Sequence, residues 1–283
     1  AAGISSYFLG FDRSFANSNP ATNDSYADLI LHNGNIATQD NLRPFVSAIA
    51  IKNGRFIAVG DDDEVIASRN NLRGDRTQVI NLQKRTVIPG LNDSHTHLIR
   101  GGLNYNLELR WDGVPSLADG LRMLREQVDR TPPNHWVRVV GGFTEFQFAE
   151  KRLPTLDELN RIAPNTPVFI LHLYDRALLN KAALRALNIT KDTPEPPGSL
   201  IERDSNGNPT GLLLAKPNAL LLYSTLARAP KLPYEFQLNS SRQFMWELNR
   251  LGITSVVDAG GGYHKYPDDY KVIEELHQRG ELT

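Results

Sequence analysis

The chain has 283 residues, and 31 Lys and Arg against 32 Asp and Glu give it a formal net charge of −1. This balance argues against a nucleic-acid-binding protein, because neutralising phosphates takes a clustered surplus of basic residues. Hydrophobic residues make up 40% and charged residues 22% of the chain, which is typical of a globular protein with its own core. No apolar run approaches the roughly 20 residues that cross a bilayer, so no membrane partner is expected.

The sequence contains no cysteine, which excludes disulfides, thiolate metal sites and cysteine nucleophiles. Any metal ion must therefore be bound by histidine and carboxylate side chains. The first methionine is Met123, so the chain does not begin at a translation start. The compartment stays open between a periplasmic or secreted protein that has lost a signal peptide and a cytoplasmic one.

Residues 1–26 are rich in Ser, Asn, Ala and Gly without sustained periodicity, which predicts an extended N-terminal arm. Short apolar runs separated by Asn-Gly turns follow, and they predict a small antiparallel β module over residues 27–88. Its expected strands are residues 27–34, 46–51, 56–59, 77–82 and 86–88.

Longer segments that alternate between strand and helix begin at residue 89. Periodicity and capping signals predict helices over residues 117–130, 155–162, 177–187, 234–251 and 269–279. Buried apolar runs predict strands over residues 136–140, 167–173, 211–214 and 252–258. This alternation favours parallel strands joined by crossover helices, hence an α/β layered or barrel domain.

The sharpest chemical feature is a His-Thr-His segment that follows Pro89-Gly90. Alternate residues of an extended strand point to the same side, so His95 and His97 can present two imidazoles to one metal ion. Neutral imidazole suits zinc and similar divalent metals. Asp93 or Asp112 could orient one of these histidines. On spacing alone, a chance pair of histidines is an equal alternative.

Six stretches of the sequence resemble one known enzyme family. Residues 27–34, 48–60 and 87–98 are similar to the amidohydrolase superfamily, and residues 153–155, 177–184 and 201–211 resemble its amidohydrolase 3 group, which includes YtcJ-like and N-substituted formamide deformylase-like proteins. The resemblance implies a small β-sandwich beside a (β/α)8 TIM-like barrel that holds one or two divalent metal ions, with zinc as the first choice. It also implies hydrolysis of an amide, formamide or related C–N bond of a small molecule by metal-activated water.

The resemblance divides the chain into three parts. They are the arm 1–26, a composite β-sandwich domain over residues 27–88, and the first part of the barrel over residues 89–283 with an insertion around residues 140–235. A (β/α)8 barrel usually takes about 250 residues, more than remain after His97. The other ligands and a general-base Asp are therefore expected beyond residue 283. The rest of the protein, in the same or a second polypeptide, would complete the barrel, and a homodimer is a further expectation.

Two more candidates follow predicted strands, where barrel enzymes place functional groups. Lys216 follows the strand over residues 211–214, and the resemblance implies that a carboxylated lysine there could bridge two metals. A surface or ion-paired lysine is the alternative. Asp258 ends the strand over residues 252–258, and it either takes part in the site or caps the following loop.

Three residues are candidates for substrate binding: Phe143, His172 and Arg176. Phe143 follows two glycines, which would allow close approach of the backbone to a substrate. His172 ends a predicted strand. The family commonly has a histidine where Arg176 stands, and an arginine favours a substrate that carries a carboxylate.

The sequence therefore predicts a metal-dependent hydrolase that acts on a C–N bond other than a peptide bond. One alternative is a metal-dependent isomerase or C–C lyase on the same fold, which would release different products. The other alternative is a catalytically inactive, metal-free binding protein, which the metal content would distinguish.

Overall fold

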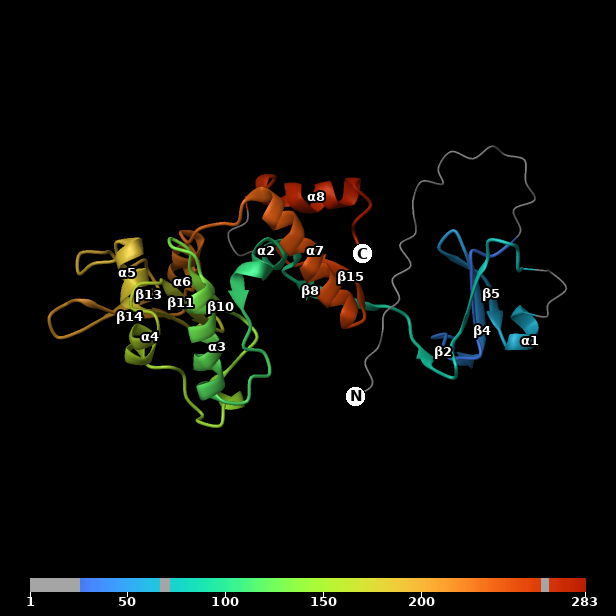
Figure 1. Ribbon diagram of the computed structural model, residues 1–283, viewed down its shortest axis with the longest axis horizontal. Coiled ribbons are helices and arrows are strands. Elements are labelled where there is room, and N and C mark those ends of the chain that lie inside the picture. Colours follow the sequence, from blue (N-terminus) through green and yellow to red (C-terminus); the bar gives the residue numbers. More distant parts are fainter. Residues whose placement is uncertain (1–25, 67–71, 261–264) are drawn as a thin grey trace. The chain divides into compact units, whose positions relative to one another are not determined.

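The computed structural model describes residues 26–66, 72–260 and 265–283 (Figure 1). The described chain forms two compact units. The N-terminal unit runs to Asn92 and includes Gly252–Ser255, and the larger unit comprises Asp93–Leu251 and Val256–Thr283. The predicted arm lies outside the described residues except for Tyr26. In these described ranges, no helix has the length and apolar character needed to span a membrane.

The N-terminal unit contains a four-stranded sheet of order β5-β4-β1-β6 and a three-stranded sheet of order β3-β2-β7. The elements are β1 Leu29–His32, β2 Asn35–Ala37, β3 Phe45–Val46, β4 Ala48–Lys52, β5 Arg55–Gly60, α1 Asp62–Val65, β6 Gln78–Asn81 and β7 Thr86–Val87. Neighbouring hairpin strands are antiparallel, but β1–β6 and β2–β7 are parallel pairs. The prediction of a purely antiparallel module was therefore wrong, because long connections let distant strands pair in the same direction.

Alternate side chains of the four-stranded sheet face opposite sides. On one side, Ile30 of β1 packs with Val65 of α1. On the other side, Leu31 and Ile49 pack with Ile36 of the three-stranded sheet. The two sheets of this unit thus share a hydrophobic cluster.

The larger unit contains a six-stranded sheet of order β13-β14-β12-β11-β10-β9. Its strands are β9 Glu108–Leu109, β10 Val137–Val140, β11 Val168–His172, β12 Arg176–Leu179, β13 Ser199–Arg203 and β14 Pro209–Ala215. β10 and β11 are parallel, as predicted, and β9, a strand that the sequence did not predict, is parallel to β10. The other three pairings are antiparallel. The prediction of parallel strands fails there because only short turns join β11 to β12 and β13 to β14, and short turns permit antiparallel pairing alone.

The helices of the larger unit are α2 Leu98–Asn104, α3 Leu117–Arg130, α4 Leu156–Ile162, α5 Lys181–Leu187, α6 Leu220–Ala227, α7 Tyr234–Arg250 and α8 Lys271–Gln278. The predicted helices at α3, α4 and α7 are confirmed to within one residue at each end. The helix predicted over residues 177–187 was wrong in its first three residues, which belong to β12. Ala177–Leu179 is buried between β11 and β14, and Asn180 then caps α5 by accepting the N–H of Ala183 at 3.0 Å.

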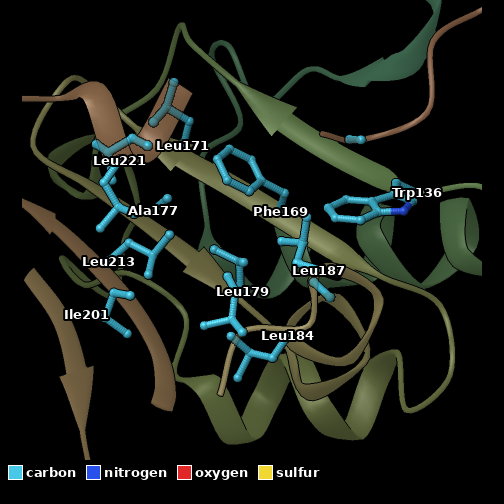
Figure 2. Packing of buried hydrophobic residues seen from close by; sticks show 14 of the residues in the cluster. Trp136, Phe169, Leu171, Ala177, Leu179, Leu184, Leu187, Ile201, Leu213 and Leu221 are labelled. Atoms are coloured by element: carbon cyan, nitrogen blue, oxygen red, sulfur yellow. The ribbon is translucent and has the colours of Figure 1, made fainter. Parts of the chain in front are cut away.

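Hydrophobic clusters cover both faces of the six-stranded sheet. Figure 2 shows the cluster on one face, where Phe169 and Leu179 of the sheet pack with Leu187 of α5. On the other face, Trp111 packs with Leu124 of α3 and with other buried side chains. Burial on both faces explains why these strands have continuous apolar sequences.

Candidate metal centre and its surroundings

The His-Thr-His segment lies at the end of a parallel strand pair. β8 Leu91–Thr96 and β15 Ile253–Asp258 form a two-stranded sheet. Hydrogen bonds from Leu91 N to Gly252 O (2.8 Å) and from Ala259 N to Thr96 O (2.7 Å) show that the strands run in the same direction. His95 lies within β8. His97 follows the strand, contrary to the prediction, because the chain turns there into α2.

The two imidazoles nevertheless lie side by side, with ring centroids 5.6 Å apart and planes inclined by 79°. His97 Nδ1 lies 2.7 Å from the carbonyl oxygen of Gly260. Because a carbonyl only accepts hydrogen bonds, the proton of neutral His97 is on Nδ1. Nε2 then carries the lone pair that binding a metal requires.

Asp258, at the end of β15, fixes this arrangement. One carboxylate oxygen accepts the N–H of Gly260 at 2.7 Å, and the other accepts the N–H of Ile99 in the first turn of α2 at 2.8 Å. Asp258 thereby fixes Gly260, whose carbonyl accepts the hydrogen bond from the His97 ring. Asp258 thus fills the capping role that the sequence left open, and it also supports the histidine.

Asp93 organises the end of β8. Its carboxylate accepts the backbone N–H of His95 and the hydroxyl of Thr96, both at 2.9 Å. These two donors lower the pKa of Asp93. Asp112, the other support proposed from the sequence, pairs with Arg110 at 3.3 Å. In the part of the chain that the structure describes, neither carboxylate is hydrogen-bonded to an imidazole, because the backbone carbonyl takes that role.

The donor chemistry of the pair fits a divalent metal ion, since both side chains are imidazoles and one has its tautomer fixed. A tetrahedral zinc site has about four ligands. Within residues 26–66, 72–260 and 265–283, no group of three or more His, Asp or Glu side chains is arranged to hold a metal. The described residues therefore bring two imidazoles together without a third side chain of these kinds.

Lys216 lies on a different sheet from this pair. It follows β14, its side chain is exposed, and its backbone N–H donates to the carbonyl of Gly198 at 2.7 Å. The structure thus puts Lys216 at the end of the six-stranded sheet, and it puts the two histidines at the end of the β8–β15 pair.

The predicted substrate-binding residues come together beyond the ends of β10 and β11. His172 is 4% exposed, and its ring nitrogens lie 2.7 Å from a carboxylate oxygen of Glu145 and 2.9 Å from one of Asp175. Because carboxylates only accept hydrogen bonds, an N–H of the His172 ring is the donor in these contacts. Arg176 Nε donates to the other oxygen of Asp175 at 2.8 Å.

This network holds its carboxylates in the ionised form. Burial alone would raise the pKa of Asp175, but hydrogen bonds from His172 and Arg176 outweigh it and lower that pKa. Phe143 is buried, and its ring centroid lies 5.8 Å from that of His172. Arg176, with 40% of its side chain exposed, is therefore the predicted residue that a substrate could reach directly.

Sequence reasoning missed Gly260 and Glu145. Both act through tertiary contacts, and no local sequence pattern encodes such contacts. Gly260, for example, contacts His97, which is 163 positions away. One signal was present for Gly260: an Asp two residues before a Gly commonly accepts that N–H within a turn. Asp258 and Gly260 have this spacing.

Comparisons with known proteins identify the family. The model of the amidohydrolase family matches residues 78–283. Protein LONG AFTER FAR-RED 3 of Arabidopsis thaliana is 31% identical over 83% of this chain and 38% of its own length. N-substituted formamide deformylase of Arthrobacter pascens is 30% identical over 82% of this chain and 42% of its own. Putative amidohydrolase YtcJ of Bacillus subtilis (strain 168) is 31% identical over 68% of this chain and 36% of its own.

The chain thus spans about two-fifths of the length of these relatives. Crystal structures of uncharacterized metal-dependent hydrolases from Pyrococcus horikoshii OT3 and Pyrococcus furiosus align with 90% of this chain at a TM-score of 0.56 and 22% identity, and the alignment covers 46% and 48% of those chains. This likeness shows a shared α/β fold, and the family match covers most of the chain. The chain belongs to the amidohydrolase family, in the group that includes YtcJ and N-substituted formamide deformylase.

Proposed function

We propose that this protein is a metal-dependent hydrolase that cleaves the C–N bond of an amide, a formamide or a related small molecule. The observation that carries the proposal is the pair of adjacent imidazoles, His95 and His97, with the second held in a metal-binding tautomer. Membership of the amidohydrolase family and the similarity to N-substituted formamide deformylase support the choice of bond.

In this proposal His95 and His97 bind one divalent ion, with zinc as the first choice because imidazole suits it. An ion held by these two residues would lower the pKa of water toward about 7 and so provide a nucleophile for a carbonyl carbon. The chain's own contribution is to hold the ligands in place. The Gly260 carbonyl keeps the proton on Nδ1 of His97, and Asp258 fixes both that loop and the start of α2.

Lys216 is a proposed ligand of a second metal ion. Reaction of its neutral amine with CO2 would form a carbamate, with loss of a proton, and the carbamate oxygens would be the ligands of that ion. The exposed position of the side chain leaves the amine open to CO2. An unchanged metal-to-protein ratio in Lys216→Ala would exclude this role.

The network around His172 is proposed to select the substrate. Arg176 has an exposed guanidinium, and a guanidinium binds carboxylates through two parallel hydrogen bonds. Phe143 and His172 would position this arginine without touching the substrate. The Phe143 ring packs on His172, and His172 is hydrogen-bonded to Asp175, which accepts from Arg176. We therefore expect substrates that carry a carboxylate.

The proposed architecture combines a TIM-like barrel, in which β8 and β15 are neighbouring strands, with a β-sandwich that includes the two sheets of the N-terminal unit. The wall of such a barrel consists of parallel strands joined by helices. β8 and β15 are parallel, and α7 leads into β15, as this arrangement requires. The sheet from β9 to β14 would then belong to an insertion between α2 and α7. The rest of the same protein would supply the remaining strands.

The test is release of free amine by the purified full-length protein from N-substituted formamides and amides, each with and without a carboxylate. We expect hydrolysis that is lost on chelation and falls about 100-fold or more in His95→Ala and His97→Ala. His277→Ala, which changes an exposed histidine, should match the unchanged protein. Isomerised or C–C-cleaved products without free amine, or equal rates in all variants, would contradict the proposal.

A further inference from the structure

A small cavity lies in the larger unit, lined by residues of α2, β10, α6, α7 and the segments beside them. Its volume is about 80 Å³. A cavity needs about 10–15 Å³ to hold one water molecule, so this cavity has room for roughly five to eight groups the size of a water molecule. Its polar lining includes Arg100, Asn104, Arg138, Lys231 and Gln237. None of these residues belongs to the proposed metal site.

Arg138 is the buried centre of this lining. It lies in β10, directly opposite Glu108 of β9, and only 4% of it is exposed. One terminal nitrogen donates to the carbonyl of Pro230, and the other reaches the Asn104 side chain at 3.5 Å, the outer limit for a hydrogen bond. Its Nε has no hydrogen-bond partner among the described residues. A buried guanidinium with so few partners is costly in free energy.

Positive charge exceeds negative charge around the cavity. Glu108, with 2% of its side chain exposed, is shared between Arg100 at 2.5 Å and Arg110 at 3.4 Å. Lys231 pairs with Asp269 at 3.4 Å. Arg110 lies outside the cavity lining and also pairs with Asp112. Arg100, Lys231 and the arginine of β10 therefore make three cations against two carboxylates. Burial lowers the pKa of that arginine to about 10 against the opposing effect of Glu108, so it stays charged at neutral pH.

We propose that this cavity binds a small oxyanion, either a phosphate or a short carboxylate. An oxyanion would accept hydrogen bonds from Arg138, which a guanidinium can donate as a fork, and it would neutralise the surplus charge. Leu103 and Leu226 also line the cavity, and the carbon chain of a carboxylate would pack against such apolar side chains. The bound anion would join α2 to β10 and so stabilise the contact between them.

The test measures the melting temperature of metal-free full-length protein against added phosphate or propionate, with NaCl at equal ionic strength as the reference. We expect the melting temperature to rise saturably with at least one of the two anions. The anion that raises it shows whether the cavity prefers a phosphate or a short carboxylate. The apparent Kd should rise about tenfold or more in Arg138→Gln and about threefold in Lys231→Gln. Lys271→Gln, an exposed lysine paired with Asp268 outside the cavity, is the matched control and should bind as the unchanged protein does.

Arg138→Lys keeps the charge but loses the fork, so it should bind almost as weakly as Arg138→Gln. If Arg138→Gln does not fold, Arg138→Lys and Lys231→Gln decide the question. A rise no larger than that with NaCl, or undiminished binding in both of these variants, would overturn the proposal. His97→Ala should retain anion binding. Loss of binding in His97→Ala would place the anion at the histidine pair instead and would also overturn it.

Discussion

At the residue scale, two successive hydrogen bonds set the tautomer of His97. The Gly260 carbonyl accepts from the ring, and Asp258 accepts from the backbone N–H of Gly260. The second carboxylate oxygen of Asp258 holds Ile99 at the start of α2, so one side chain fixes both segments that flank the histidine. Residues that support a ligand in this way contribute to metal affinity without touching the metal.

We therefore expect Asp258→Ala to lower metal affinity by about 10- to 100-fold, measured by competition with a chelator of known affinity. Asp258→Asn retains one acceptor oxygen and should recover part of the loss. Asp268→Ala removes an exposed carboxylate that pairs with Lys271 and serves as the control. Unchanged affinity in a folded Asp258→Ala protein would show that the two hydrogen bonds do not support the ligand.

The histidine pair could be proposed from the sequence because its two members are two positions apart. Its support could not, because Gly260 reaches His97 only once β8 and β15 have paired. The same limit applies to His172. The sequence placed it at the end of a strand, but the carboxylate of Glu145 that contacts its Nε2 comes from a short 3-10 helix 27 positions away.

At the element scale, α4 begins with reciprocal hydrogen bonds between Thr155 and Glu158. The Thr155 hydroxyl accepts the N–H of Glu158 at 3.2 Å, and the Glu158 carboxylate accepts the N–H of Thr155 at 2.8 Å. Arg152 donates to both oxygens of Glu158 at 2.9 and 2.8 Å. The Arg152 hydrogen bonds, followed by those from Thr155, lower the pKa of Glu158 from 4.5 to about 2.

Because the pKa of Glu158 is lower in the folded state, its contribution to stability is complete above pH 4.5 and disappears as the pH falls toward 2. We expect Glu158→Gln to lower the free energy of unfolding by about 1 kcal/mol at pH 7 and by progressively less in acid. Urea unfolding between pH 7 and pH 3 measures this difference. Glu274→Gln, on the exposed face of α8, is the control. An equal loss at every pH would assign the effect to something other than the charge.

The sequence predicted α3, α4 and α7 well because each carries its signals locally, as a periodic apolar stripe or a capping residue. It failed at residues 177–187 because the first part of this segment is a short apolar run, which is ambiguous between strand and helix. Neighbouring strands decide the outcome. β12 pairs with β11 on one side and β14 on the other, and these contacts outweigh the local helical preference.

At the scale of the whole molecule, the α/β class followed from the alternation of strands and helices, and the family followed from motifs spread along the chain. Strand direction in the six-stranded sheet did not follow, because it depends on connection length and on which strands meet. The parallel pair β8–β15 joins segments more than 150 positions apart. The proposed metal site depends on that pairing, since one strand carries His95 and the other ends at Asp258.

In the proposed function, His95 and His97 together bind a catalytic divalent metal. The most direct test of this binding is the metal-to-protein ratio of the purified full-length protein, determined by elemental mass spectrometry after reconstitution with zinc and removal of loose ions. We predict one or two ions per chain in the unchanged protein and in His277→Ala, and a loss of at least one ion in both His95→Ala and His97→Ala. A ratio that is near zero throughout, or the same in all four proteins, would show that these histidines do not bind a metal.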